Sequence, residues 1–175
     1  AITNVASALL MEPAIAERIE VVWLGGHAPY WPTCHEFNLM QDLHAVRIVF
    51  DSSAPLVLIP CEPVASHLQT TVAELEAHLA PYSQLGRYLT DIVRDYEDNR
   101  PAWSKVIWDI SASAYAIDPS SLQMAEEPVP ILQDDLTCVH DDSRRRIQVV
   151  QTVDRNAIFA DFFKKARALR ESVLS

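Results

Sequence analysis

Two short apolar runs constrain the fold of this chain most strongly. Residues 20–24 read Glu-Val-Val-Trp-Leu and stop at a Gly-Gly pair, and residues 54–61 form a second run bracketed by prolines. Short, β-branched runs that end in a turn are typical of strands buried on both faces of a parallel sheet. Because helical periodicity fills much of the remaining chain, the sequence predicts an α/β fold.

The apolar spacing predicts the helices and a further strand. Helices are expected from Asn4, from about Asp42, within 64–99 with a second segment over 85–96, over 108–117, and from Asp154 onward. Asn4 and Asp154 have side chains suited to N-caps. Residues 147–153 alternate and predict an edge strand, whereas the Pro-rich residues 120–142 read as irregular with short strands.

The charge balance argues against nucleic-acid and membrane partners. Fourteen Lys and Arg residues against 24 Asp and Glu residues give a formal net charge of −10. A net acidic surface repels phosphate groups and anionic lipid. The one basic run, residues 144–146, follows Asp141 and Asp142 and reads as a solvated, locally neutralised loop. The longest apolar stretch is far too short to cross a bilayer.

The cysteine pattern indicates a redox compartment, and the first residues indicate where the chain begins relative to its fold. Cys34, Cys61 and Cys138 are widely separated and show no Cys-x-x-Cys spacing, so neither a disulfide framework nor a structural zinc is expected. This usage favours a reducing, cytoplasmic compartment. The chain opens at Ala1 without a methionine and enters a helical pattern at once, which we interpret as a start inside a longer fold.

Polar residues follow the first apolar run, where ligands of α/β sheets gather outside the carboxyl ends of strands. If residues 36–38 are extended, Glu36 and Asn38 project to one side and Phe37 points into the core. A carboxylate beside an amide can bind vicinal hydroxyls by accepting and donating hydrogen bonds. The alternative is that Glu36 caps a neighbouring helix and Asn38 forms an Asx-turn.

A second candidate pair, Trp108-Asp109, stands at the head of the helix expected over 108–117. An Asp in a first helical turn commonly complements the helix dipole, and a carboxylate is also a good Ca²⁺ ligand. Trp108 is either a core residue or an aromatic wall for a planar ligand. The six histidines show no His-x-His or His-x-x-x-His spacing, and no Gly-x-Ser-x-Gly motif is present.

Motifs spread along the chain form a recognisable series. They are Ile2-Thr3-Asn4, Glu12-Pro13, residues 21–26, Glu36-Phe37-Asn38, Asp42 with Ala45, Ile48-Val49-Phe50, Pro60, Trp108-Asp109 with Ala112, residues 115–119, and Val153-Asp154. Together they resemble the inosine–uridine-preferring nucleoside hydrolase family, most weakly between residues 64 and 105. The resemblance implies a Rossmann-like, layered, mostly parallel sheet with helices on both faces, here lacking its amino-terminal part. Residues 1–175 would be the carboxyl-terminal portion of a single nucleoside-hydrolase-like domain.

The resemblance also implies an activity. The family hydrolyses the N-glycosidic bond of ribonucleosides with a bound Ca²⁺, through an oxocarbenium-like transition state. It implies that Glu36 and Asn38 hold ribose hydroxyls and that Asp109 is a calcium ligand. The family's aspartate-rich amino-terminal motif, which supplies two calcium ligands and the general base, is absent here. No catalytic residue is therefore expected in this chain, and the chain alone is expected to be inactive.

Two departures from the family pattern affect the substrate. Trp108 replaces the usual His, and Tyr30 replaces the usual Asn. An indole ring cannot release a proton near neutral pH, so Trp108 can only stack or donate through its nitrogen. The resemblance implies that Trp108 and Tyr30 are substrate-binding residues. The substrate is then a nucleoside or a related ribosyl or sugar compound.

The resemblance leaves other functions open and implies further partners. The alternatives to an enzyme are a catalytically inactive sugar- or nucleoside-binding relative and a structural remnant. The expected protein partners are the amino-terminal segment of the same protein and further copies of it, because the family's enzymes are commonly dimers or tetramers.

Overall fold

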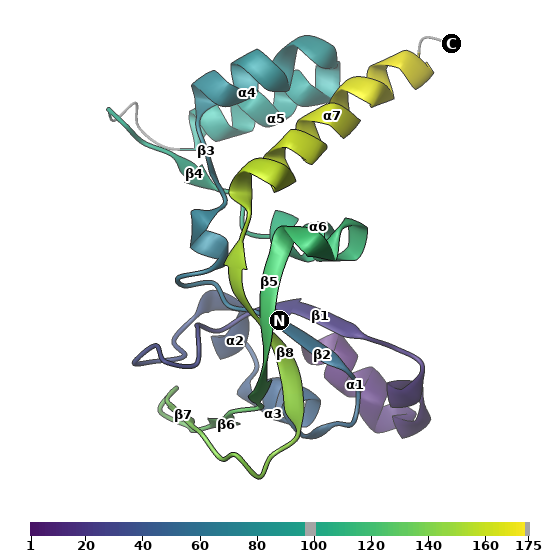
Figure 1. The fold of residues 1–175 in the computed structure, drawn as a ribbon, viewed down its shortest axis with the longest axis vertical. Helices are drawn as coiled ribbons and strands as arrows, with labels where there is room; N and C mark the ends of the chain where they lie inside the picture. Colours follow the sequence, from purple (N-terminus) through teal and green to yellow (C-terminus); the bar gives the residue numbers. More distant parts are fainter. Residues whose placement is uncertain (97–100, 174–175) are drawn as a thin grey trace. The chain divides into compact units, whose positions relative to one another are not determined.

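The computed structural model describes residues 1–96 and 101–173 (Figure 1). The chain forms two compact units, the first made of Ala1–Ser66 and Trp108–Val153, the second of His67–Ile107 and Asp154–Ser175. The assignment of all 175 residues to a single domain stays a prediction.

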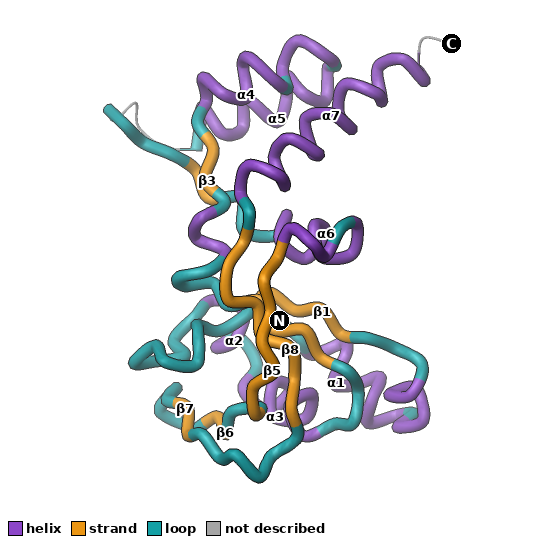
Figure 2. Tube along the Cα trace, in the orientation of Figure 1, coloured by secondary structure: helices purple, strands orange, loops and turns teal. Residues whose placement is uncertain are grey.

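A mixed four-stranded sheet with the order β1-β2-β8-β5 forms the centre of the first unit (Figure 2). Strands β1 (Val21–Leu24), β2 (Leu56–Ile59) and β8 (Arg146–Val153) run parallel, and β5 (Leu122–Pro128) pairs antiparallel with β8. The other elements of this unit are α1 (Thr3–Met11), a 3-10 turn at Pro13–Glu17, α2 (Phe37–Met40), α3 (Leu43–Asp51), α6 (Ile110–Ile117), a 3-10 turn at Pro119–Ser121, and the antiparallel pair β6 (Ile131–Leu132) and β7 (Cys138–Val139). The predicted α/β class is confirmed.

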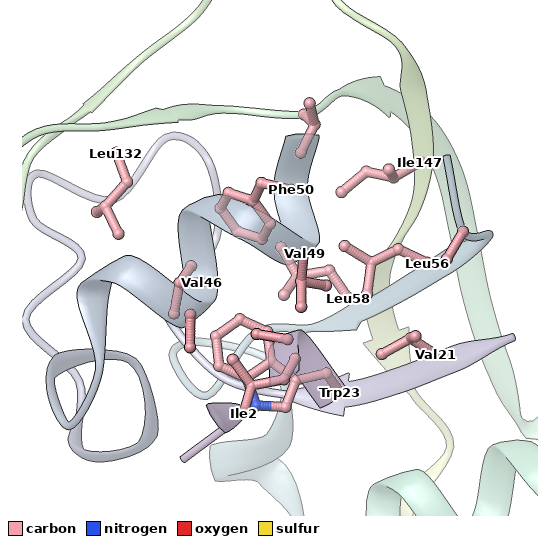
Figure 3. Packing of buried hydrophobic residues seen from close by; sticks show 14 of the residues in the cluster. Ile2, Val21, Trp23, Val46, Val49, Phe50, Leu56, Leu58, Leu132 and Ile147 are labelled. Atoms are coloured by element: carbon pink, nitrogen blue, oxygen red, sulfur yellow. The ribbon is translucent and has the colours of Figure 1, made fainter. Parts of the chain in front are cut away.

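Helices cover both faces of this sheet. Alternate strand residues point to opposite sides, so each face has its own set of apolar side chains to bury. On one face, Trp23 and Leu58 join buried residues of α1 and α3 (Figure 3). The Trp23 ring meets Phe50 of α3 edge-on, with centroids 6.3 Å apart. On the other face, Leu24 and Ile59 belong to a second buried cluster, against which α6 packs. The two strands are therefore buried on both sides, as their apolar sequences predict.

Capping explains where several helices begin. Asp42 accepts a hydrogen bond from the Ala45 N–H at 3.0 Å at the start of α3, and Asp154 accepts one from Ala157 at 2.9 Å. The predicted cap at Asn4 is wrong, because α1 begins at Thr3 with Ile2 in the N-cap position. Ile2 is buried in the core, so packing rather than a polar cap determines where this helix starts.

The position of β8 differs from the prediction. Residues 147–153 were expected at a sheet edge, whereas β8 lies between β2 and β5. Strand β5 pairs with β8 along its whole length, with a register shift between Gln123 and Met124. Its sequence, Leu-Gln-Met-Ala-Glu-Glu-Pro, has no β-branched residue, so sequence propensity gave no sign of this seven-residue strand.

The second unit is mainly helical. It holds β3 (Gln69–Thr70) antiparallel to β4 (Lys105–Val106), α4 (Val72–His78), a 3-10 turn at Ala80–Tyr82, α5 (Gln84–Asp95) and α7 (Arg155–Val173). Thr71 caps α4 and Ser83 caps α5 through their hydroxyl oxygens. The helical pattern over 64–99 is thus divided between two helices and shorter elements, and its last residues, 97–99, lie outside the described residues.

The basic run, residues 144–146, corrects the prediction of a solvated, locally neutralised loop in part: carboxylates do pair with two of its arginines, but Arg144 and Arg145 are half-buried and only Arg146 is exposed. Arg144 forms an ion pair with Asp51, and Arg146 forms one with Glu126. Arg145 is half-buried, and its guanidinium donates three hydrogen bonds of 3.0–3.1 Å, to the carbonyl oxygens of Val49, Phe50 and Ala54. A cation at the C-terminal end of α3 also complements the helix dipole.

Replacing Arg145 by alanine should lower the free energy of unfolding by about 2–3 kcal/mol, because three carbonyls lose a charged donor. The exposed Arg146→Ala is the matched control and should change stability by less than about 0.5 kcal/mol. Urea denaturation of both variants measures the difference. Equal effects of the two substitutions would contradict the role given to Arg145.

Cys34 and Cys138 form a disulfide, which the sequence analysis did not expect. The two residues are 104 positions apart, and their Cα atoms are 6.6 Å apart. The loop after β1 and the β6–β7 pair converge, as the 2.7 Å hydrogen bond from Cys34 N–H to the Leu136 carbonyl shows. Sequence spacing carries no information on such a contact. Cys61 is a free, buried thiol. Among residues 1–96 and 101–173, no helix is long and apolar enough to cross a membrane.

Candidate functional site

The candidate site is built at the carboxyl ends of β1 and β2. Gly25 and Gly26 follow β1 directly, and the Gly26 carbonyl accepts a 2.9 Å hydrogen bond from the Cys61 N–H, just after β2. Gly26 has a φ of +67°, which a residue with a side chain rarely adopts. A Cβ on Gly25 would lie 2.3 Å from a ring atom of Trp23, so this position requires glycine. The predicted turn after the first strand is therefore present and sterically specified.

Glu36 holds the start of α2. Its carboxylate accepts hydrogen bonds from three backbone N–H groups, those of Gly26 at 2.8 Å, Asn38 at 2.9 Å and Leu39 at 3.1 Å. The residue is 8% exposed. Glu36 thus caps its own helix and ties that helix to the turn after β1. A buried carboxylate is stable here because backbone dipoles replace its hydration.

The segment 36–38 is not extended, which corrects the prediction. Glu36 occupies the N-cap position and Phe37 begins α2. The Phe37 side chain is 72% exposed and does not point into the core. The extended interpretation failed because it took no account of the N-cap bonds that start a helix at this point.

Asn38 nevertheless lies beside Glu36 at the end of β1. Its side-chain Nδ2 donates a 3.1 Å hydrogen bond to the Leu24 carbonyl, the last carbonyl of the strand. The Asn38 side chain is therefore oriented by the sheet rather than by an Asx-turn. The carboxamide oxygen and the second N–H hydrogen have no role in this bond.

Trp108 and Asp109 lie at the start of α6 and differ in burial. The half-buried Trp108 packs against the cluster that contains Leu24, Ile59 and Cys61, which are residues at the ends of β1 and β2. Asp109 occupies the N-cap position of α6, but its side chain makes no capping hydrogen bond and is exposed. Hydrogen-bonded capping therefore explains Glu36 but does not explain Asp109.

Cys61 connects these residues electrostatically. The pKa of its thiol is raised, first by burial and then by the negative charge and hydrogen bonding of Glu36, with smaller effects from Glu62 and Asp109. Both Glu36 and Asp109 therefore lie near one buried thiol. The sequence analysis did not identify Cys61, although its place directly after the second apolar run was a usable signal. A thiol with a raised pKa is a poor nucleophile, so Cys61 is a structural neighbour of the site.

Tyr30 lies in the loop of residues 27–35 that connects the turn to Glu36. Its side chain is 71% exposed, whereas Trp31 beside it is 37% exposed and packs on the His27 ring at 6.0 Å between centroids. The loop itself is fixed by backbone contacts, among them Ala28 N–H to the Glu62 carbonyl at 2.8 Å. The convergence of Glu36, Asn38, Tyr30, Trp108 and Asp109 in one concave site stays a prediction.

The comparison with protein families identifies the chain. The family model described as "Inosine-uridine preferring nucleoside hydrolase" matches residues 1–160. The chain belongs to this family. The resemblance inferred from its motifs is therefore confirmed, including the weak region between residues 64 and 105, which lies inside the match.

Individual proteins similar to this chain are named as nucleoside hydrolases. An inosine-uridine preferring nucleoside hydrolase of Crithidia fasciculata is 32% identical over 139 residues, which cover 74% of this chain and 43% of that protein. A putative pyrimidine-specific ribonucleoside hydrolase of Shigella boydii is 28% identical over 137 residues, covering 74% of this chain and 56% of that protein. The chain thus spans about half the length of the curated relatives it matches.

A solved structure shows the same fold. The crystal structure of an inosine-uridine preferring nucleoside hydrolase from Bacillus anthracis matches with a TM-score of 0.67 at 20% identity, covering 95% of this chain and 57% of that chain. The predicted Rossmann-like arrangement, a sheet with parallel strands and helices on both faces, is confirmed by this likeness and by the packing of the first unit.

Proposed function

We propose that the protein containing this chain is an N-ribohydrolase that cleaves the N-glycosidic bond of ribonucleosides or of a related ribosyl compound. The observation that carries the proposal is the placement of Glu36 and Asn38 side by side at the end of β1, in a chain of the nucleoside hydrolase family. The relatives are named for inosine, uridine and pyrimidine ribonucleosides, which share the ribose. Ribose is therefore the part of the substrate that these two residues would bind.

The hydrogen bonds around Glu36 and Asn38 leave capacity for hydroxyl groups. A carboxylate has about four lone-pair sites. Backbone N–H groups occupy three of those on Glu36 and the Cys61 thiol, a weak donor, is bonded to the carboxylate as well, so a substrate hydroxyl would take the place of the thiol. Asn38 retains its carboxamide oxygen and one N–H, which can accept from and donate to a second hydroxyl. Both side chains are fixed by the backbone before a substrate arrives, which reduces the entropy lost on binding.

The remaining candidate residues would act on the other parts of the substrate. Trp108 offers a half-buried indole that can stack on a base or on the apolar face of a sugar. Tyr30 would contact the substrate from the loop after β1. Neither side chain can take the proton from a water molecule near neutral pH. Following the resemblance to the family, we place the general base in the amino-terminal part of the protein.

Calcium binding is part of the proposal, and the described residues offer few ligands for it. In the described part of the chain, no group of three or more His, Cys, Asp or Glu side chains could hold a metal ion. Ca²⁺ takes about six to eight oxygen ligands, and Asp109 supplies one exposed carboxylate. The calcium dependence included in our proposal therefore requires ligands from the amino-terminal part of the protein. We include that segment and further copies of the protein as partners, and exclude nucleic acid and membranes.

The cytoplasmic location expected from the cysteine pattern is not part of the proposal. That expectation depended on the absence of a disulfide, and Cys34 and Cys138 are bonded. Disulfides persist mainly in oxidising compartments.

A catalytically inactive sugar- or nucleoside-binding protein is the second candidate. Trp108 favours it, because an indole cannot protonate a leaving group where the family has a His. Ribose release from inosine and uridine by the intact protein, followed with a reducing-sugar assay at several Ca²⁺ concentrations, separates the two functions. Release of ribose and free base in equal amounts supports the hydrolase. Saturable nucleoside binding without ribose release at any Ca²⁺ concentration supports the binding protein.

Replacing Trp108 by alanine in the intact protein should weaken inosine binding about tenfold, since stacking on one base contributes about 1–3 kcal/mol. Because the ring also packs on the core cluster, the free energy of unfolding should fall by about 1–2 kcal/mol, less than for a fully buried Trp. Titration calorimetry and urea denaturation measure the two effects. The control Trp108→His should raise activity toward ordinary nucleosides. Unchanged affinity with a loss of stability would show that Trp108 is only a core residue.

A further inference from the structure

The loop of residues 27–35 is attached at its first end to the residues after β2. The Glu62 N–H donates to Nδ1 of His27 at 3.2 Å, and Nε2 of His27 is 3.2 Å from the His35 carbonyl. A neutral imidazole that accepts at Nδ1 carries its proton at Nε2, so it can make both bonds at once. The Ala28 N–H adds a 2.8 Å bond to the Glu62 carbonyl. This end of the loop is therefore fixed to the same strand ends that hold Glu36.

The second end of the loop is attached to the β6–β7 pair, which lies about 100 residues further along the chain (Figure 1). The Leu136 carbonyl accepts hydrogen bonds from the Cys34 N–H at 2.7 Å and from the Thr33 hydroxyl at 3.2 Å. The disulfide from Cys34 to Cys138 is the only covalent link among these contacts. Residues 133–137 themselves form a tight turn, with Gln133 N–H bonded to the Thr137 carbonyl at 2.9 Å.

The His140 ring adds a contact in the middle of the loop. Its Nε2 lies 2.9 Å from the Pro29 carbonyl, directly before Tyr30. Cys138 begins β7 and His140 directly follows it, so the disulfide and this hydrogen bond hold the loop at two points from neighbouring residues. If the segment moves away, the loop loses its covalent anchor and the contact beside Tyr30 together.

We propose that the Cys34–Cys138 disulfide is a redox-sensitive clip that keeps the loop of residues 27–35, with Tyr30 and Trp31, in its substrate-binding position. The proposal rests on the proposed function, since it assigns regulation to the same site. A dithiol reductant attacks the sulfur of Cys138, which is half-buried, and displaces the Cys34 thiolate. Its second thiol then resolves the mixed disulfide. The protein gains two electrons and two protons as two thiols, and the dithiol becomes a cyclic disulfide.

The third cysteine does not take part in this exchange. Cys61 is 6% exposed in the second core cluster, whereas Cys34 belongs to the first. Exchange requires a thiolate, and burial beside Glu36 keeps the Cys61 thiol protonated. Cys34 and Cys138 are therefore reduced and reoxidised as one defined pair.

Thiol counting and amide exchange on the intact protein test the clip. Alkylation under denaturing conditions, followed by peptide mapping, should label Cys61 but neither Cys34 nor Cys138 in the oxidised protein, and all three of these residues after dithiothreitol treatment. Reduction should speed hydrogen exchange at the Cys34 amide by about tenfold or more, and chymotrypsin should then cut faster between Tyr30 and Trp31. Inosine, used as the probe, should bind several-fold more weakly to the reduced form, and reoxidation should restore its affinity.

The double variant Cys34→Ala with Cys138→Ser should behave like the reduced protein with and without dithiothreitol. If that variant does not fold, reduction of the natural protein still decides the question. Labelling of Cys34 and Cys138 in the oxidised protein would overturn the proposal, as would unchanged exchange of the Cys34 amide after reduction. If the oxidised protein binds no inosine, the proposed function fails, and the exchange rates still show whether the disulfide holds the loop.

Discussion

Replacing Glu36 by alanine should lower the free energy of unfolding by about 3 kcal/mol, because its buried carboxylate satisfies three backbone N–H groups. Two of these groups are orphan donors at the start of α2, and the third belongs to Gly26 in the turn after β1. A lost N-cap alone costs about 0.5–2 kcal/mol. The additional loss comes from the Gly26 N–H, which then lies at the end of the sheet without a charged acceptor.

Two matched variants separate the carboxylate charge from the shape of the side chain. Glu36→Gln keeps one acceptor oxygen and the size of the residue, so about half of the loss is expected. Asp42→Ala removes a cap that binds one backbone N–H at α3, and it should cost about 1 kcal/mol. Urea denaturation curves fitted with a common m-value give the free energies of unfolding of the three variants. A Glu36→Ala variant no less stable than Asp42→Ala would show that the bond to Gly26 contributes nothing.

Sequence reasoning succeeded where local chemistry decides the outcome. The strands β1 and β2 follow from apolar runs that can only be buried on both faces, and the glycines after β1 follow from the turn that must end it. The cap at Asp154 and a helix start at about Asp42 were predicted, and an acidic side chain at a helix start has a specific N–H donor to bind in both cases. These features depend on a few neighbouring residues.

The errors arose where tertiary contacts override local preference. Strand β5 forms from a sequence without β-branched residues because β8 offers a complete ladder of partners. The contact of Cys34 with Cys138 depends on two segments 104 positions apart, and Arg145 depends on the end of α3. Glu36 shows a subtler case. Both of its interpretations, as a cap and as a ligand, were available from the sequence. The structure confirms the cap, and the ligand role stays a prediction.

Glu36 and Asp109 differ in how much of their role the fold explains. Every backbone N–H that Glu36 binds belongs to the scaffold, so fold stability is enough to explain a carboxylate at this position. Asp109 lies at the start of α6, makes no capping hydrogen bond and is exposed, so its carboxylate contributes little to the stability of the fold. A carboxylate that a helix does not use, near the ends of β1 and β2, is available for a ligand.

Replacing Asp109 by asparagine in the intact protein should therefore reduce kcat/KM for inosine by about 100-fold or more, as expected for loss of a charged ligand to a metal that stabilises several kcal/mol of transition-state charge. Stability should change by less than about 0.5 kcal/mol, since the side chain is exposed and caps no N–H. The activity should recover in part at high Ca²⁺ concentration, because a weakened site fills by mass action. A stability loss as large as that of Glu36→Ala would assign Asp109 to the scaffold instead.

The isolated chain of 175 residues provides the complementary measurement. It should release no measurable ribose and should bind Ca²⁺ only weakly, because the described residues offer one candidate carboxylate to an ion that takes about six to eight oxygens. Titration calorimetry with Ca²⁺ and a reducing-sugar assay test both points, with the intact protein as the control. Micromolar Ca²⁺ affinity of the isolated chain would contradict the need for further ligands, and ribose release by it would show that a general base lies within these residues.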